Sequence, residues 1–450
     1  MNVNRKEFIT ATALAAGAIP MVGMAAGGRR NMCGYSAKPI DKIKVGIIGL
    51  GMRGGGAVNR LSKIKDVEIV ALCDLREGKV ANAQKTLAKA GREPAKEFSG
   101  TEDAWKKLVA LDLDLVYVVT PWRWHAPMCI YAMKHGKHTC TEVPAAVTIE
   151  EAWELVETSE KTGKHCMMLE NCCYDFFEMQ TLNMVRQGVF GELTHAEGAY
   201  IHALCGLIAN EKGGYQDMWR FHQNNTHNGD LYPTHGLGPV AQCMNINRGN
   251  LFSHLVSMSS QEAAFTEWAR ENGREKMAAL KNYRGDMNTT LIKCAKGQTI
   301  MVQHDVSTPR PYSRIHLIQG TKGMARKWPK QQIALGHGWQ NDEQMKELKA
   351  KYEHPLSRTM GEIARKVGGH GGMDFIMDYR LIYSLKNGLP LDQDVYDAAA
   401  WSSVVPLSIA SVANNSRSID VPDFTRGAWK TNKPLGIVDV KPSLLPVVGT

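Results

Sequence analysis

The chain has 450 residues, 44% of them apolar, and a formal charge of +9. This length holds about two or three domains, and the apolar content is sufficient for buried cores. The Lys and Arg residues are spread along the chain without a basic block, so the charge gives no footprint for nucleic acid. We therefore predict a folded globular protein with a solvated basic surface and no nucleic-acid partner.

Residues 1–27 differ in composition from the rest of the chain. Arg5 and Lys6 precede an Ala-rich run that ends in small residues, which is the layout of an export signal; the alternative is a disordered apolar N-terminus. The segment around Arg5 resembles a twin-arginine (Tat) signal with Lys in place of the second Arg. The run is too short and too rich in Gly and Ala for a good membrane span. We expect export to the periplasm, no membrane span, and a linker over residues 28–41.

Ten cysteines would suit a disulfide framework in an exported protein. Six of them, however, lie within apolar stretches, where buried free thiols are the default. These are Cys73, Cys129, Cys140, Cys166, Cys243 and Cys294.

The segment Lys44–Asp74 is the most informative stretch of the chain. An apolar run, a glycine-rich turn, a helical segment and a second apolar run follow one another, which predicts a strand, turn, helix, strand unit. Gly49 permits the tight turn, Gly51 lets backbone N–H groups approach a diphosphate, and Gly54 lets helix and strand pack closely. Asp74, twenty residues after Gly54, is placed to bind an adenosine ribose, which favours NAD over NADP.

The next segments continue an alternation of strands and helices. Four strands end in polar or aromatic residues, and the carboxyl ends of parallel strands meet at one crevice. We therefore expect these residues to be neighbours: Asp74, Trp122, Arg123, Trp124, His125, Glu142 and Asn171. The predicted strands after residue 74 are 113–120, 138–141 and 164–169, and the helices are 78–90, 103–109, 127–135 and 149–162.

After a helix over residues 178–187, longer runs of β-branched and alternating residues predict an open mixed or antiparallel sheet. Its strands are expected at 193–201, 251–258, 289–295, 299–305 and 314–319, with a long polar loop at 215–236. Helices at 374–386 and 395–413 are expected to pack against the first domain. The fold class is thus α/β, with a Rossmann domain at 42–170, a substrate-binding α+β domain at 171–425 and an extended tail at 426–450.

Within the polar loop, Tyr232-Pro233-Thr234-His235 is the sharpest candidate for chemistry. A rigid turn would hold a phenol and an imidazole together, and either group moves protons near neutral pH when its surroundings shift its pKa. The alternative is a structural turn with a satisfied His. The His residues of this loop show no regular ligand spacing, so no metal site is expected.

Three further side chains are candidates for the same space. Glu142 ends a strand at the cofactor crevice, where a carboxylate costs solvation unless it holds something. Tyr174 lies three residues past Asn171; structural packing is its alternative role. Tyr312 follows two prolines and is expected to line the pocket.

The overall pattern resembles the glucose-fructose oxidoreductase, inositol dehydrogenase and MocA (Gfo/Idh/MocA) family from about residue 42 to 425. That family has Glu-Lys-Pro at the end of the fifth strand. Here the tripeptide is Glu142-Val143-Pro144, and Val143 cannot exchange a proton. WRWH at 122–125, EVP at 142–144, Asn171 followed by Tyr174, and a loop from Arg220 containing YPTH together resemble glycoside hydrolase family 109.

This second resemblance implies an α-N-acetylgalactosaminidase that retains anomeric configuration and uses tightly bound NAD. Hydride leaves C3 of the sugar, elimination expels the glycosidic oxygen, water adds, and the hydride returns. The implied proton carriers are His235, Tyr232, Tyr174 and Glu142. The implied NAD contacts are Gly49, Gly51, Met52, Arg53, Gly54, Asp74, Trp122, Arg123, Trp124, His125, Glu142, Val143, Asn171 and Tyr232, and the implied sugar contacts are Arg220, Tyr232, Pro233, Thr234, His235, Tyr200 and Tyr312.

Two other functions remain open at this point. One is an exported NAD-dependent sugar or cyclitol dehydrogenase, the majority activity of the wider family. The other is a sugar-binding or sensory protein on a Rossmann scaffold. Val143 and the export signal favour the hydrolase, because an exported enzyme has no NAD pool to draw on. A homodimer is an expectation from relatives with this fold.

Overall fold

The structure, a computed structural model, describes residues 29–449. It divides into residues 1–30 and residues 31–450, and the following concerns the second unit. The predicted export signal, residues 1–27, lies outside the described residues.

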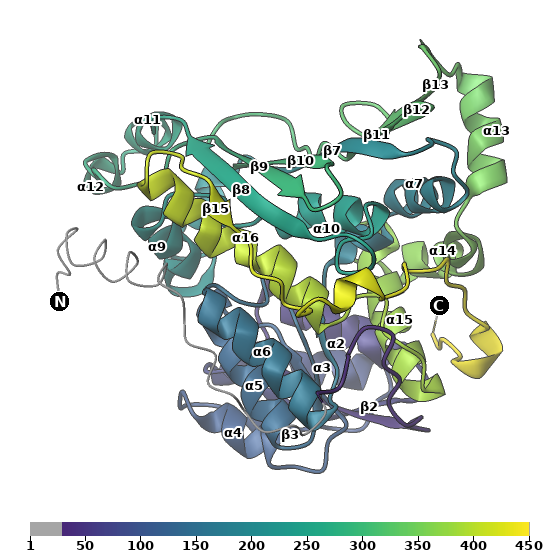
Figure 1. The fold of residues 1–450 in the computed structure, drawn as a ribbon. Helices are drawn as coiled ribbons and strands as arrows, with labels where there is room; N and C mark the ends of the chain where they lie inside the picture. Colours follow the sequence, from purple (N-terminus) through teal and green to yellow (C-terminus); the bar gives the residue numbers. More distant parts are fainter. Residues whose placement is uncertain (1–28, 450) are drawn as a thin grey trace. The chain divides into compact units, whose positions relative to one another are not determined.

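The first sheet has six parallel strands in the order β3-β2-β1-β4-β5-β6 (Figure 1). Every residue of β4 and β5 is buried, as is typical of a parallel sheet with helices on both faces. The predicted Rossmann fold is thereby confirmed. Its elements are β1 (Ile43–Ile48), α2 (Met52–Ser62), β2 (Val67–Cys73), α3 (Glu77–Lys89), β3 (Lys96–Phe98), α4 (Ala104–Val109), β4 (Leu115–Val118), α5 (His125–Lys134), β5 (His138–Thr141), α6 (Ile149–Thr162) and β6 (Cys166–Met168).

The second sheet has nine strands in the order β14-β13-β12-β11-β7-β10-β9-β8-β15. Strands β7 and β10 are parallel and the other neighbours are antiparallel. Along β9, buried residues alternate with less buried ones, so one face carries the core and the other is open. The strands are β7 (Leu193–Ile201), β8 (Phe252–Ser259), β9 (Asn288–Cys294), β10 (Thr299–Asp305), β11 (Leu317–Gly320), β12 (Gly323–Arg326), β13 (Gln332–Leu335), β14 (Gly338–Trp339) and β15 (Ile419–Asp420).

Helices fill the space between the sheets. Figure 1 shows α16 between β8 and α6, and the contacts agree. Among the described residues, α16 is the one helix long and apolar enough to cross a membrane, but 78% of its apolar window is buried inside the protein, as in a core helix. The helices are α7 (Phe176–Arg186), α8 (Cys205–Ile208), α9 (Trp219–Thr226), α10 (Thr234–Cys243), α11 (Ala264–Glu271), α12 (Glu275–Ala278), α13 (Asp342–Tyr352), α14 (Pro355–Val367), α15 (Met373–Asn387) and α16 (Val395–Ala413).

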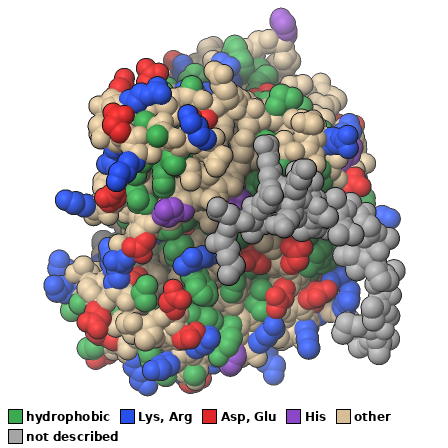
Figure 2. All heavy atoms as spheres, turned by 90° about the vertical axis from the view of Figure 1, so that its left-hand side faces the viewer, with side chains coloured by type: hydrophobic (Ala, Val, Ile, Leu, Met, Phe, Trp, Pro, Cys, Tyr) green, Lys and Arg blue, Asp and Glu red, His purple; other side chains and the backbone are tan. Residues whose placement is uncertain are grey.

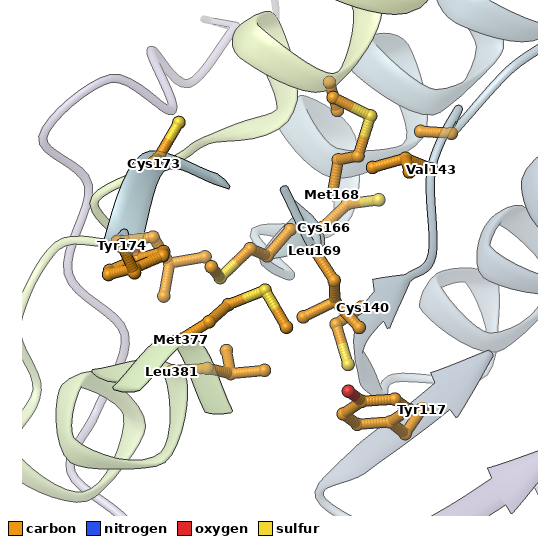
Figure 3. Packing of buried hydrophobic residues seen from close by; sticks show 14 of the residues in the cluster. Tyr117, Cys140, Val143, Cys166, Met168, Leu169, Cys173, Tyr174, Met377 and Leu381 are labelled. Atoms are coloured by element: carbon orange, nitrogen blue, oxygen red, sulfur yellow. The ribbon is translucent and has the colours of Figure 1, made fainter. Parts of the chain in front are cut away.

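Helix α15 packs against the Rossmann domain. Figure 3 shows its Met377 and Leu381 beside Cys140 and Tyr117 of the parallel strands. The Tyr117 hydroxyl donates a 2.8 Å hydrogen bond to Asp378 of α15, so the apolar contact also carries a buried polar link. The prediction that both long C-terminal helices pack on the first domain is confirmed.

The ends of the described chain are attached to the two long helices α15 and α16. The backbone N–H of Met32, a buried residue, donates to the Tyr396 hydroxyl at 3.3 Å. In the tail, the Tyr379 hydroxyl donates to the carbonyl of Leu445 at 2.9 Å. The predicted linker and tail therefore contain anchored residues.

All ten cysteines are free, and all but Cys33 are buried, which confirms the prediction of buried thiols. On the face shown in Figure 2, acidic and basic side chains are interspersed.

The prediction of a continuous loop over residues 215–236 was wrong. The segment contains α9, and α10 begins within it at Thr234. The polar composition hid α9, which buries only Arg220, Phe221 and Asn224. Pro233 precedes the first residue of α10, a place that tolerates proline because the N–H there has no helical partner.

Two glycines let α10 lie directly on β7. A Cβ at Gly236 would stand 2.1 Å from the backbone nitrogen of Ala199, and one at Gly198 would stand 2.4 Å from the carbonyl oxygen of Gly236. No side chain fits between these backbones, so the sequence THGLG allows α10 to approach the sheet at this distance.

We predict that Gly236→Ala lowers the free energy of unfolding by about 1–3 kcal/mol, the usual scale of overpacking. The added methyl forces α10 away from β7. Gly206→Ala on α8 is the matched control, because its Cβ would meet nothing within 4 Å. Urea unfolding of both variants measures the difference; equal stability would contradict the tight contact.

Candidate functional site

The glycine turn after β1 has the geometry of a dinucleotide cradle. Gly49 has φ +91°, and a Cβ there would lie 2.4 Å from the carbonyl oxygen of Val119. A Cβ at Gly54 would lie 1.9 Å from the oxygen of Gly49, whereas one at Gly51 would meet open space. No side chain caps the first turn of α2 and it holds no acidic residue. Its N–H groups are therefore available to an anion such as a diphosphate.

Asp74 organises the same turn. Its carboxylate accepts the N–H of Leu50 at 2.7 Å and the N–H of Arg76 at 3.0 Å. Met52 and Leu75 are exposed apolar side chains beside these groups, and the sequence analysis missed Leu75. A negative group, an open glycine and apolar surface at one strand end fit an adenine dinucleotide.

Arg53 links two other predicted residues. Its guanidinium binds Glu142 through Nε at 3.0 Å and Nη2 at 2.9 Å, and Asp374 through Nη1 at 2.7 Å. Asn171 donates to the second oxygen of Asp374 at 2.5 Å. Arg53 thus joins the end of β5 directly and the end of β6 through Asp374, which the sequence analysis did not select.

The buried charges of this network are balanced. Burial raises the pKa of Asp374, but the hydrogen bond from His370 and the charges of Arg53 and Arg60 outweigh it and hold that pKa well below its ordinary value. Glu142 is engaged by Arg53 on one oxygen. The geometry therefore makes Glu142 an ion-pair partner at the crevice.

An aromatic cluster lies between the two domains. The rings of Trp122 and Tyr232 are stacked with centroids 5.6 Å apart, and Tyr200 lies 4.8 Å from Tyr232. His235 meets Tyr232 edge-on at 4.9 Å and Tyr200 at 5.5 Å. The structure thus brings together residues from the Rossmann domain, β7 and the start of α10.

Arg220 is the buried cation of this cluster. Its guanidinium lies 4.6 Å from the ring centroid of Tyr232 and 5.2 Å from that of Trp122. Nη1 donates to the Tyr215 hydroxyl at 2.8 Å, and Nη2 has no partner among the described residues. A buried donor without a partner favours a polar ligand at this point.

The phenols around Arg220 are kept neutral. Burial raises the pKa of Tyr200 to about 12 and that of Tyr232 well above its ordinary value, and the charge of Arg220 opposes both shifts. Tyr232 is therefore protonated at neutral pH, the form in which a phenol can donate a proton.

His235 hydrogen-bonds to a carboxylate that the sequence analysis missed. Its Nδ1 lies 2.8 and 3.0 Å from the two oxygens of Glu170. The Glu170 side chain is fully buried and that of His235 is 14% exposed. The signal was present in the sequence, because Glu170 directly follows the expected strand 164–169, but its neighbour Asn171 was chosen instead.

Tyr312 lies at the edge of the cluster, with its ring centroid 6.3 Å from that of Tyr200 and 5.0 Å from that of His202. His202 accepts or donates a 3.2 Å hydrogen bond with the Tyr200 hydroxyl and was not among the candidates. Its place two residues after Tyr200, just past the end of β7, was the available signal.

Three of the predicted contact residues are buried within the protein. Tyr174 is corrected: its hydroxyl donates to Asp392 at 3.1 Å inside the core, so it does not reach the cluster. His125 is corrected too, because both ring nitrogens lie 2.7 Å from the carbonyl oxygens of Thr120 and Pro144. Thr234 is fully buried at the start of α10 and is a packing residue.

The remaining candidates differ in how far they are buried. Trp122 and Val143 are buried, Trp124 is half-buried and Arg123 is exposed with its guanidinium 5.7 Å from the Trp124 ring centroid. Pro233 is buried between Tyr232 and α10.

Family comparisons agree with this architecture. The oxidoreductase family with an NAD-binding Rossmann fold matches residues 43–170, and the C-terminal domain of glycosyl hydrolase 109 matches residues 174–431. Among solved structures, levoglucosan dehydrogenase in complex with NADH and L-sorbose superposes with a TM-score of 0.64 at 19% identity, covering 85% of this chain and 100% of that one. This likeness concerns the fold.

Relatives of known family are much more similar in sequence. Glycosyl hydrolase family 109 protein 1 of Bacteroides fragilis is 48% identical over 424 residues, 90% of each chain. A protein of the same species named alpha-N-acetylgalactosaminidase is 50% identical over 408 residues, 89% of this chain and 96% of its own length. With this identity over nearly the whole chain, and with both domains matched, the chain is a glycosidase that belongs to glycosyl hydrolase family 109.

Proposed function

We propose that this glycosidase hydrolyses terminal α-linked N-acetylgalactosamine with retention of configuration, using a resident NAD. The relative at 50% identity is named for this activity. The observation that carries the proposal is the cluster of Tyr232, His235 and Arg220 beside the dinucleotide cradle. It supplies proton carriers and a cation where a sugar would meet a cofactor.

The two carboxylates nearest the cluster each have a partner within the protein. Ordinary retaining glycosidases need two carboxyl groups about 5–5.5 Å apart, one as nucleophile and one as acid or base, and NAD-dependent hydrolases are an exception. Here Glu142 is bound by Arg53 and Glu170 by His235. Because each carboxylate already has a partner within the protein, the arrangement supports a route that uses proton transfer in place of a carboxylate nucleophile.

When bound, NAD supplies reversible hydride transfer at C3 of the sugar. A carbonyl at C3 acidifies the proton on C2, so a base removes that proton while an acid protonates the departing glycosidic oxygen. We assign these two proton transfers to the imidazole of His235 and the neutral phenol of Tyr232, whose rings meet edge-on with centroids 4.9 Å apart. Arg220 stabilises negative charge that develops on the phenols near it.

Val143 supports this assignment over a simple dehydrogenase. It is buried and apolar at the strand end where the wider family resemblance expects a lysine beside the nicotinamide. The second candidate, a sugar dehydrogenase, is favoured only by folds such as that of levoglucosan dehydrogenase. We also propose export to the periplasm on the composition of residues 1–27.

The deciding assay uses p-nitrophenyl α-N-acetylgalactosaminide with no added cofactor. Nitrophenolate release without accumulation of NADH is expected from a hydrolase that regenerates its cofactor in every turnover. Steady growth of NADH absorbance with added NAD and free sugar, without nitrophenolate release, would instead establish the dehydrogenase.

Replacing either proposed proton carrier should slow turnover. His235→Ala and Tyr232→Phe are each expected to lower kcat by about 10²-fold or more, the scale of a positioned acid or base. His222→Ala is the control, because His222 is exposed on nearby α9. Wild-type rates in both site variants would remove this cluster from the mechanism.

Removal of the C2 proton during elimination can be detected as deuterium in the product. Hydrolysis in D₂O should yield N-acetylgalactosamine with deuterium at C2, because the base exchanges its proton with solvent before returning it. Proton NMR of the product measures the label. A product without deuterium, from a slow incubation, would exclude removal of the C2 proton by an exchangeable base.

The glycine turn should control retention of the cofactor. Gly54→Ala is expected to weaken NADH binding at least about tenfold, or 1.4 kcal/mol, since its methyl would collide with the oxygen of Gly49. Gly55→Ala on the same helix is the control, because its Cβ would meet nothing within 4 Å. Fluorescence titration of protein freed of nucleotide compares them, and equal affinities would contradict the cradle.

A further inference from the structure

We infer that Glu170 is the positioning residue of His235: it holds the proton on Nδ1 and keeps Nε2 as the nitrogen that exchanges a proton with the substrate. This inference rests on the proposed function for the identity of the substrate. The geometry of the pair does not depend on it.

Glu170 is held rigidly from several sides. The backbone N–H of Cys172 donates to its Oε1 at 3.0 Å. Gln393 accepts the backbone N–H of Glu170 at 3.3 Å and donates to its carbonyl at 2.9 Å. Because main chain and carboxylate are both fixed, the oxygen that faces Nδ1 cannot turn toward another donor.

The other half of the pair is fixed by α10. His235 is the second residue of that helix, and the partial positive charge at a helix N-terminus disfavours an imidazolium there. Gly238 brings the helix against its partner, since a Cβ there would lie 2.8 Å from Cγ of Glu170. The buried carboxylate therefore offsets the field of the helix and stabilises the cation that forms when Nε2 takes a proton.

The groups around the His235 ring support different roles for its two nitrogens. Tyr200 and Tyr232 approach His235 edge-on, and Arg220 lies behind the two phenols. None of the hydrogen bonds between described residues uses Nε2, whereas Nδ1 faces both Glu170 oxygens. Burial raises the pKa of Glu170, but its interaction and hydrogen bond with His235 outweigh this and hold that pKa below its ordinary value, so the carboxylate is ionised at neutral pH.

The same atoms also have the spacing of a metal site. Glu170, Cys172 and His235 each offer a ligand atom, and these lie within 4.8 Å of one another. Two observations favour the hydrogen-bonded pair. The Arg314 guanidinium lies 3.2 Å from the Cys172 sulfur, where it repels a cation, and burial raises the pKa of that thiol well above its usual range, so it stays protonated.

Glu170→Gln tests the inference, because it keeps the shape and removes the charge. Nitrogen-15 NMR of His235 should show only the Nδ1–H tautomer in the wild type, and a mixture in the variant, since an amide offers either a donor or an acceptor. The variant should lose about 10²-fold in kcat with little change in KM. The acid limb of its pH profile should move to lower pH.

Glu170→Asp and Glu150→Gln complete the design. The aspartate keeps the charge and should recover the single tautomer and part of the rate, even if its shorter side chain lowers stability. Glu150 is an exposed carboxylate on α6, and its variant should behave as the wild type. Thermal melts identify any variant that has lost its fold. If Glu170→Gln does not fold, the tautomer and rate of Glu170→Asp decide whether the inference holds.

The outcomes separate the two claims. Suppose that the wild type hydrolyses the glycoside, and that Glu170→Gln has the same His235 tautomer, rate and pH profile as the wild type. The inference is then overturned and the proposed function stands. If the wild type has no glycosidase activity, the tautomer experiment still tests the pair. Stoichiometric metal in the purified protein that is lost in both His235→Ala and Glu170→Gln would overturn the pair in favour of a metal site.

Discussion

The contact of α10 with β7 is the constraint on which the site depends. At Gly198 and Gly236 the two backbones approach so closely that neither position admits a Cβ. This approach sets the positions of Tyr232, two residues before the start of α10, and His235, the second residue of that helix. A longer separation would leave the phenol and imidazole out of reach of Trp122 and Glu170, and the cluster would lose its common centre.

Buried charge forms the second constraint. Arg53 joins the helix of the glycine turn to Glu142 and Asp374, and Arg220 sits among phenol rings. Removing a guanidinium from water is costly unless carboxylates or aromatic faces replace the lost hydration. These groups connect the Rossmann domain with the second domain, because the ion pair of Arg53 reaches Asp374 and the guanidinium of Arg220 lies against the rings of both Trp122 and Tyr232.

Local signals in the sequence predicted much of this arrangement. The glycine spacing and Asp74 predicted the dinucleotide cradle, and the ends of the parallel strands predicted that Trp122, Glu142 and Asn171 would meet. The partners Glu170 and Asp374 were not found, since each is one of many carboxylates and only its neighbour in space distinguishes it. Tyr174 was misplaced for the same reason: a tyrosine near a strand end has no local feature that says which way it points.

The sequence by itself determined the Rossmann unit, five of the nine strands of the second sheet and the Tyr232–His235 pair, because apolar periodicity, glycines and prolines act over a few residues; the short strands β12 to β15 were not predicted. Only the tertiary structure decided which groups hold that pair. His235 meets Glu170 across 65 positions, and Arg53 meets Asp374 across 321. Such contacts follow from the packing of α10 and α15 against the sheets, and no short stretch of the chain encodes them.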